Sequence, residues 1–185
     1  MFEIDGFVEA CLAAKHDSEN AVREVVQKAV GDASGLMAAL GEPSEAGIQT
    51  IHRSDTLTIL NIVWTPMLNS GPHEHRMWAV IGVYTGGEDS IFWRRRPDRI
   101  EAAGASSLRE GEVESLGWNI IHSVTNPTGK LTGAIHVYGG DFFATKRSEW
   151  NPETLLEAPY DLGGNDKFFA DANALYKFMT HAEHQ

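Results

Sequence analysis

The segment NSGPHEHRMWAVIGVYTGG, residues 69–87, decides how the rest of the chain is interpreted. His73 and His75 stand one residue apart, immediately before an apolar run. Since alternate residues of a β-strand point to the same face, both imidazoles would project into one space. Imidazole is the commonest protein ligand for metals. The segment therefore predicts a strand that carries part of a metal site.

Length and charge limit the classes of protein that fit this sequence. The chain has 185 residues, of which 42% are hydrophobic, enough for one well-packed domain and scarcely enough for two. We therefore expect a single domain over residues 1–185. The formal net charge of −11 argues against a nucleic-acid partner, which would need a surplus of Lys and Arg on one face. The short run Arg94 to Arg96 is typical of a solvated surface, although it could steer an anionic ligand.

The beginning of the chain fits neither a signal peptide nor a membrane anchor, because it has no basic leader and Glu9 interrupts its apolar stretch. No stretch approaches the length of a transmembrane helix, so we expect no membrane partner. The single cysteine, Cys11, cannot form an internal disulfide and is expected to pack as a small hydrophobe. These features predict a cytoplasmic, soluble protein, and they leave its oligomeric state open.

The hydrophobic pattern divides the chain into three parts. Residues 1–46 form a helical N-terminal segment of two or three short helices, because Val22, Val26 and Ala29 recur at helical spacing. Residues 47–150 form a barrel core of many short β-branched strands punctuated by Gly and Pro. Within the core we expect one hairpin that turns at Gly86-Gly87 and another that turns at Asn126 to Gly129.

A C-terminal helix is predicted over residues 165–183. Asn165 or Asp166 would cap its first turn. Its expected apolar face, packed on the sheet, consists of Phe168, Ala172, Leu175 and Met179.

A third histidine, His122, extends the candidate metal site. It stands in the apolar segment GWNIIHSVTNP, at the distance a barrel needs to return a strand beside the first one. Three neutral nitrogen ligands on one side of a metal leave open positions opposite, which is typical of a catalytic site. Such a triad also accepts Zn, Ni, Cu or Mn, so the ligands alone do not select the metal. His16, His52, His181 and His184 are interpreted as surface or structural residues.

The spacing of these residues resembles two motifs of the cupin superfamily, over roughly residues 47–145. The matching residues are His73, His75, Gly87, Gly111, His122 and Asn126. The departures are Met67 for the leading Gly of the first motif, Val80 for its Glu, and Gly117 and Asn119 for the Pro and Gly of the second. The resemblance implies a mainly β fold, a double-stranded β-helix (jelly-roll) barrel, here with N-terminal helices and a C-terminal helix.

Without the glutamate, the site resembles the cysteine dioxygenase-type branch of the superfamily, and its bacterial thiol dioxygenases in particular. The segment AIHVY carries His136 and Tyr138, similar to the Ser-His-Tyr relay of that branch, but Ala134 stands in place of the serine. Arg53 occupies the position at which the family presents an arginine to the substrate carboxylate. Trp64, nine residues before His73, resembles an aromatic residue of the pocket wall.

This resemblance implies a mononuclear non-haem Fe(II) enzyme that oxidises a small thiol, such as cysteine or 3-mercaptopropionate, to its sulfinic acid with O2. Three uncharged imidazoles leave Fe(II) with a net charge of about +2, which favours an anionic thiolate. Arg53 would bind a carboxylate in bidentate fashion, and Tyr138 would donate a hydrogen bond to oxygen.

Several alternatives stay open. Arg53 could form a surface ion pair, and His136 and Tyr138 could be ordinary core residues with satisfied hydrogen bonds. The chain could be another metal-dependent cupin enzyme, either a dioxygenase that cleaves a carbon–carbon bond or an isomerase, acting on a small organic acid. It could also be a non-catalytic cupin that binds a small ligand.

Overall fold

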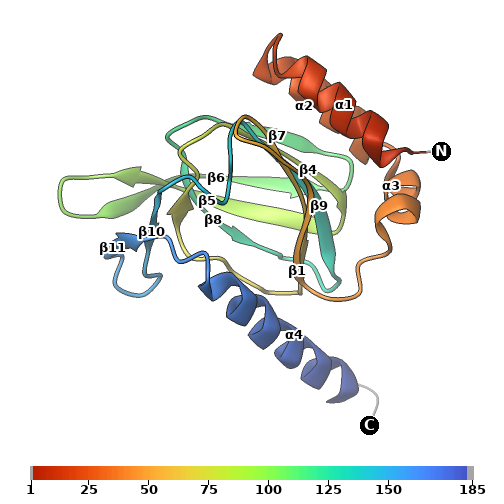
Figure 1. Ribbon diagram of the computed structural model, residues 1–185. Helices are drawn as coiled ribbons and strands as arrows, with labels where there is room; N and C mark the ends of the chain where they lie inside the picture. Colours follow the sequence, from red (N-terminus) through yellow and green to blue (C-terminus); the bar gives the residue numbers. More distant parts are fainter. Residues whose placement is uncertain (1, 183–185) are drawn as a thin grey trace.

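The architecture, seen in a computed structural model, is a β-barrel flanked by helices, and the structure describes residues 2–182 (Figure 1). The barrel consists of two antiparallel sheets with strand orders β1-β2-β9-β4-β7 and β11-β10-β3-β8-β5-β6. The first sheet contains β1 (Gly47–Arg53), β2 (Thr58–Trp64), β4 (Ala79–Thr85), β7 (Val113–Leu116) and β9 (Thr132–Tyr138). The second contains β3 (His73–Glu74), β5 (Gly87–Arg95), β6 (Ile100–Arg109), β8 (Ile121–Thr125), β10 (Ser148–Trp150) and β11 (Glu157–Pro159). This mainly β, double-stranded β-helix is the fold class that the sequence predicts.

Three helices precede the barrel, in agreement with the prediction: α1 (Ile4–Ala14), α2 (Glu19–Val30) and α3 (Ala33–Leu40). Ser18 caps α2 by accepting a hydrogen bond from the backbone N–H of Ala21 at 3.1 Å. The helices cover the outer face of the five-stranded sheet, where Val22 and Val26 of α2 belong to the same buried cluster as Val80 and Tyr84 of β4. Strands β2 and β9 are therefore buried on both faces along their whole length.

Both predicted hairpins are wrong. β4 and β5 lie in different sheets, and so do β8 and β9. The chain crosses from sheet to sheet at Gly86, whose φ is +78° and where a Cβ would lie 2.2 Å from Oγ1 of Thr132. Glycine correctly marks a sharp change of direction, but the partner of each strand depends on which interior face it buries. β5 instead pairs with β6 and β8, and β9 pairs with β2 and β4.

The C-terminal helix is α4 (Gly164–Ala182), one residue from its predicted start, and residue 183 lies outside the described residues. Its first turns pack on the barrel through Phe169 and Ala172, and the helix then runs away from the sheets (Figure 1). The predicted apolar face is consequently only half correct, since Leu175 is 61% and Met179 50% exposed. Among residues 2–182, no helix is both long enough and apolar enough to cross a bilayer.

Candidate metal centre

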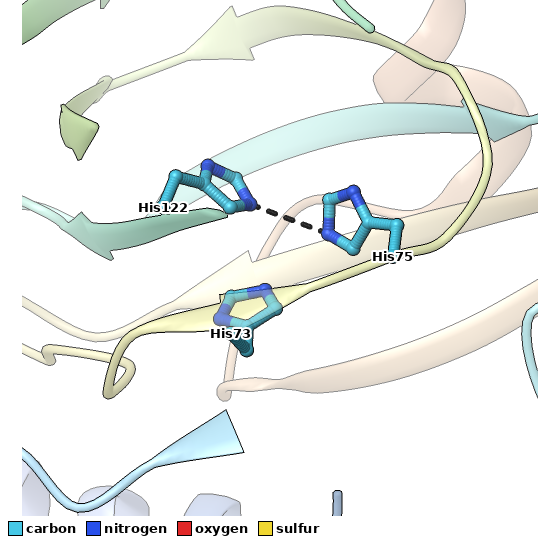
Figure 2. Close-up of side chains that lie close together, drawn as sticks. All are labelled: His73, His75 and His122. Carbon is cyan, nitrogen blue, oxygen red and sulfur yellow. Dashed lines mark hydrogen bonds between the residues drawn. The ribbon is translucent and has the colours of Figure 1, made fainter. Parts of the chain in front are cut away.

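Two neighbouring strands and the loop after one of them bring the three histidines together (Figure 2). β3 pairs with β8 in antiparallel register, and His73 lies directly opposite His122. His75 follows β3 and points to the same side as His73, as the alternation predicts. Glu74, between them, is engaged elsewhere: its carboxylate contacts Arg76 at 2.6 Å and Arg95 at 3.3 Å.

The distances between the imidazole nitrogens suit a single metal ion. One ligand atom from each histidine lies within 4.8 Å of the others, and Nε2 of His75 is 3.3 Å from Nε2 of His122. Two nitrogens each about 2.1 Å from one metal, at angles of roughly 90–109°, would lie about 3.0–3.4 Å apart. The His75–His122 pair already has the separation of two ligands of one ion.

The surroundings of the triad favour the neutral imidazole that a metal needs. His73 donates a hydrogen bond from Nδ1 to the carbonyl oxygen of Gly71 at 2.9 Å, because that oxygen can only accept. Its Nε2 therefore keeps the lone pair for a ligand bond. Burial lowers the pKa of His73 to about 4, and burial lowers the pKa values of His75 and His122 well below their usual range.

The sequence motif places Val80 at the position of the acidic ligand, but in the structure this residue faces the helices and not the triad. Val80, which the motif places at the glutamate position, is fully buried in the cluster between the helices and the five-stranded sheet. Ala79 and Ile81, its neighbours on β4, belong to the cluster inside the barrel. The interior face of β4 thus carries no carboxylate, and within the described residues the candidate ligand group is the three histidines alone.

Tyr138 and His136, both on β9, lie on the same side of the barrel wall as the triad and line the same cavity. The ring of Tyr138 meets the ring of His75 edge to face, with centroids 5.0 Å apart. Its hydroxyl is 3.1 Å from Nδ1 of His136. Burial raises the pKa of Tyr138, so the hydroxyl stays protonated at neutral pH. Both side chains border the cavity described below.

Glu88, a residue that the sequence analysis missed, lies behind this pair. It is 2% exposed, and its Oε1 accepts a hydrogen bond from the indole N–H of Trp64 at 2.7 Å. The same oxygen is 3.4 Å from Nε2 of His136, a contact whose geometry falls short of a hydrogen bond. A carboxylate directly after two glycines indicates a solvated turn, so only the inward alternation of Glu88 and Ser90 on β5 could have revealed its position.

Arg53 does not reach the candidate site. Its guanidinium binds the carboxylate of Asp141 through Nε and Nη2, at 3.0–3.1 Å, and its side chain is 49% exposed. Arg53 is not among the residues that line the cavity. The role of carboxylate binder that the resemblance assigns to Arg53 is therefore not supported by its position, because this arginine sits at the rim with its charge already paired.

Arg147 is the cation that lies near the triad. Its guanidinium is stacked between the rings of Phe142 and Tyr160, 4.2 and 4.1 Å from their centroids. Phe142 in turn packs on Tyr138, and Tyr160 packs on His73. Arg147 is 7% exposed, and its Nε and Nη2 have no hydrogen-bond partner within the described residues. Its Nη1 donates to the carbonyl oxygens of Phe142 and Thr145, at 2.5 and 3.2 Å. A buried guanidinium with neutral acceptors alone is costly, and an anion would offset that cost.

A cavity of about 530 Å³ lies beside the triad, and Phe142 and Tyr160 line it while Arg147, stacked between these two rings, does not. All three histidines, Tyr138 and His136 line it, and so does Trp64, as the sequence analysis expects of a pocket wall. Much of the remaining wall is aromatic or aliphatic, and it comes from both sheets, from the segment around Trp150 and from α4. The cavity is of the size that holds small organic ligands.

Comparisons with known proteins give likenesses of fold. No family model matches the chain. Similar solved structures include an RmlC-like cupin family protein with a double-stranded β-helix fold from Methanocaldococcus jannaschii, 11% identical with a TM-score of 0.47, covering 56% of this chain and 87% of that one. An uncharacterised protein with a double-stranded β-helix domain from Klebsiella pneumoniae is 12% identical with a TM-score of 0.44, covering 65% and 90%. Oxalate oxidase is 12% identical with a TM-score of 0.42, covering 54% of this chain and 53% of its own.

Proposed function

We propose that this protein is a mononuclear non-haem Fe(II) thiol dioxygenase that converts a thiol bearing a carboxylate into its sulfinic acid. The observation that carries the proposal is the donor set: three neutral imidazoles with no carboxylate in the ligand group. Such a set leaves the charge of a divalent ion uncompensated, which favours an anionic sulfur ligand over a neutral one. Zn, Ni, Mn and Cu fit the same nitrogens, so the choice of iron rests on the resemblance to thiol dioxygenases.

The reaction consumes one thiol and one O2. Two S–O bonds form, the O–O bond breaks, and both oxygen atoms end on sulfur. Sulfur gives up four electrons and O2 accepts them, while the thiol proton passes to the sulfinic acid or to solvent. When bound, Fe(II) would supply the redox chemistry and a common meeting point for the two reactants.

The side chains around the triad have distinct duties in this proposal. We assign the carboxylate-binding role to Arg147, which does not itself line the cavity but stacks on Phe142 and Tyr160, two rings that do. Unlike the guanidinium of Arg53, it has no carboxylate partner among the described residues, and its Nε and Nη2 are free to donate. Tyr138 offers a neutral hydroxyl beside His75. Phe142 and Tyr160 exclude water around the guanidinium, which strengthens its attraction for an anion.

Oxygen uptake by anaerobically purified, iron-loaded protein tests the proposal, with cysteine, 3-mercaptopropionate and cysteamine as substrates. We expect uptake with the thiols that carry a carboxylate, little with cysteamine, and a product heavier than the thiol by two oxygen atoms. Iron-loaded protein that consumes no oxygen with any thiol would contradict the proposal. That result would favour the alternative of a metal-dependent enzyme acting on a non-thiol organic acid, and a chain that binds no metal would favour a ligand-binding protein.

A further inference from the structure

The cavity extends well beyond the triad. The histidines belong to the six-stranded sheet, whereas Ile62 and Trp64 line the cavity from β2 of the other sheet. Phe168 and Phe169 of α4 line it as well, and Phe169 packs on Trp64 with ring centroids 5.9 Å apart. An apolar wall from β2 and α4 therefore borders the same space as the histidines.

This space is larger than the smallest thiol acids require. Cysteine has seven non-hydrogen atoms, and at about 30 Å³ each, the share of a water molecule in the liquid, it would occupy roughly 200 Å³. The cavity measures about 530 Å³. The remaining volume adjoins aromatic side chains, which gain free energy by burying apolar surface and not by hydrating charge.

We propose that the substrate is a mercapto carboxylic acid with an apolar body of about the size of a phenyl or branched alkyl group. This inference rests on the proposed function for the thiol, and on the cavity for the body. The sulfur faces the triad, and the body contacts the apolar wall formed by Ile62, Trp64, Phe168 and Phe169. The carboxylate lies on the side of Phe142 and Tyr160, the cavity-lining rings that stack on the Arg147 guanidinium.

Binding of simple acids to the metal-free protein tests the apolar wall without metal, oxygen or thiol. Trp64 and Trp150 line the cavity, so quenching or enhancement of tryptophan fluorescence reports occupancy. We expect 3-phenylpropionate to bind at least ten-fold more tightly than propionate. Phe168→Ala should weaken the binding of 3-phenylpropionate about five-fold or more and leave propionate unchanged. Leu175→Ala, on the same helix at a side chain that is 61% exposed, is the matched control and should change neither.

Equal affinity for the two acids, or no saturable binding of either, would overturn the inference. If Phe168→Ala does not fold, Ile62→Trp decides instead: filling the cavity should exclude the aryl acid and spare propionate. Oxygen uptake with 2-mercapto-3-phenylpropionate then separates the two proposals. Tight binding of the aryl acid without oxidation of any thiol would leave the ligand class intact and refute the dioxygenase, whereas oxidation of 3-mercaptopropionate alone would do the reverse.

A second inference comes independently from Glu88. The indole N–H of Trp64 can only donate, so Oε1 of Glu88 acts as an acceptor toward it at 2.7 Å. The same oxygen is the charged group facing Nε2 of His136 at 3.4 Å, and contacts of this kind often tighten only in a complex with substrate. A carboxylate facing Nε2 favours the imidazole tautomer that carries its proton there. Nδ1 then holds the lone pair and accepts the hydroxyl proton of Tyr138 at 3.1 Å.

We infer that Glu88 is a positioning residue that replaces the serine absent at Ala134. By fixing the tautomer of His136, it directs the hydroxyl proton of Tyr138 toward His136. The oxygen of Tyr138 then faces the cavity as an acceptor, oriented to take a hydrogen bond from the thiol S–H before the sulfur gives up that proton and binds as a thiolate. The order of groups resembles the acid, imidazole and hydroxyl arrangement in which a buried carboxylate orients a histidine.

Nitrogen-15 NMR of histidine-labelled, metal-free protein measures this tautomer directly. We expect His136 to carry its proton on Nε2 in the wild type and to become a mixture of tautomers in Glu88→Ala, with kcat about 10- to 100-fold lower and KM little changed. Glu88→Gln keeps an acceptor oxygen and should restore most of both signals. Tyr84→Phe is the control, because it removes another buried hydrogen bond, to Asn61 at 2.9 Å. Tyr84 lies on the helix-covered face of the five-stranded sheet, away from His136 and Tyr138.

A wild-type His136 protonated on Nδ1 would overturn this inference even if no Glu88 variant folds. The same tautomer in the wild type and in a folded Glu88→Ala would also overturn it.

Discussion

The two faces of β4 are equally buried and serve different purposes. Ala79, Ile81 and Val83 face the barrel interior, in the cluster that includes Tyr138. Val80 and Tyr84 face the helices, in the cluster that includes Val22 and Val26. The helix-covered face is packed with apolar groups from three helices, whereas the interior face belongs to the same cluster as Tyr138, which lines the cavity.

This difference shows that burial alone does not locate a site. A one-residue shift along a strand moves a side chain from the site to the structural core. Substitutions on the interior side should therefore change metal binding and catalysis, and substitutions on the helix-covered side should change stability.

The largest expected effect is on the interior side, at a metal ligand. His122→Ala should lower the affinity for Fe(II) by more than about 100-fold, since even the loss of a group that merely orients a ligand costs 10–100-fold. Thiol-dependent oxygen uptake should fall to background. Metal analysis after anaerobic reconstitution is the measurement, and the exposed His16→Ala is the control. Full iron content and full activity in His122→Ala would exclude the site.

The next largest effect is expected on the helix-covered face of β4, at Val80. Val80→Glu would place a carboxylate among apolar side chains, without a partner, and should destabilise the fold by roughly 4 kcal/mol or more. Val80→Ala should cost about 2 kcal/mol and lower Tm by several degrees, with iron binding unchanged. Urea denaturation and metal titration give both quantities. A stable Val80→Glu protein with altered metal affinity would mean that Val80 faces the site after all.

Two arginines, Arg147 and Arg53, test whether the position of a positive charge decides its effect on substrate binding. Arg147→Gln should raise KM for a thiol carboxylate about 10- to 100-fold, as expected for the loss of a charge-assisted hydrogen bond worth about 1.5–3 kcal/mol. Arg53→Gln should leave steady-state kinetics nearly unchanged, because its partner is Asp141 at the surface. Kinetics with a thiol lacking a carboxylate are the internal control. Equal effects of the two substitutions would contradict the assignment of Arg147.

The smallest effect concerns pH. Folding lowers the pKa of His73 to about 4, while an unfolded histidine titrates near 6.5. Between these values the unfolded chain binds more protons than the folded one, so stability is complete above about pH 6.5 and is lost as the pH falls toward 4. Metal-free protein should lose on the order of 1–2 kcal/mol in the upper part of this window, between about pH 6.5 and pH 5. Urea unfolding at several pH values measures the slope, and His73→Gln should flatten it; a slope that rises toward acid would refute the burial of a neutral triad.

Local patterns predicted the triad because its geometry follows from local rules. His73 and His75 share a face through simple alternation. His122 lies in an apolar strand, and such a strand is expected inside the sheet, where it pairs with the strand of His73. The helices were also predictable, since their periodicity repeats over several turns. By contrast, the glycine-rich patterns at Gly86 and Asn126 predict turns correctly but not the pairing of the strands that flank them, because those strands belong to different sheets.

Arg147 and Glu88 could not be predicted in the same way. Arg147 lies in an irregular segment without periodicity, and its site is made by Phe142 and Tyr160 from either side of it. Glu88 lies next to a crossing between the sheets, where a charged residue usually indicates solvent. In both cases the proposed role of the residue depends on contacts that no local pattern encodes.

The most direct test of the account is a crystal structure of protein loaded anaerobically with Fe(II), with anomalous data collected at the iron edge. A three-histidine centre predicts one strong peak about 2.1 Å from Nε2 of each of His73, His75 and His122, with no carboxylate bound to it. A peak elsewhere, or iron held by fewer than these three histidines, would contradict the three-histidine centre.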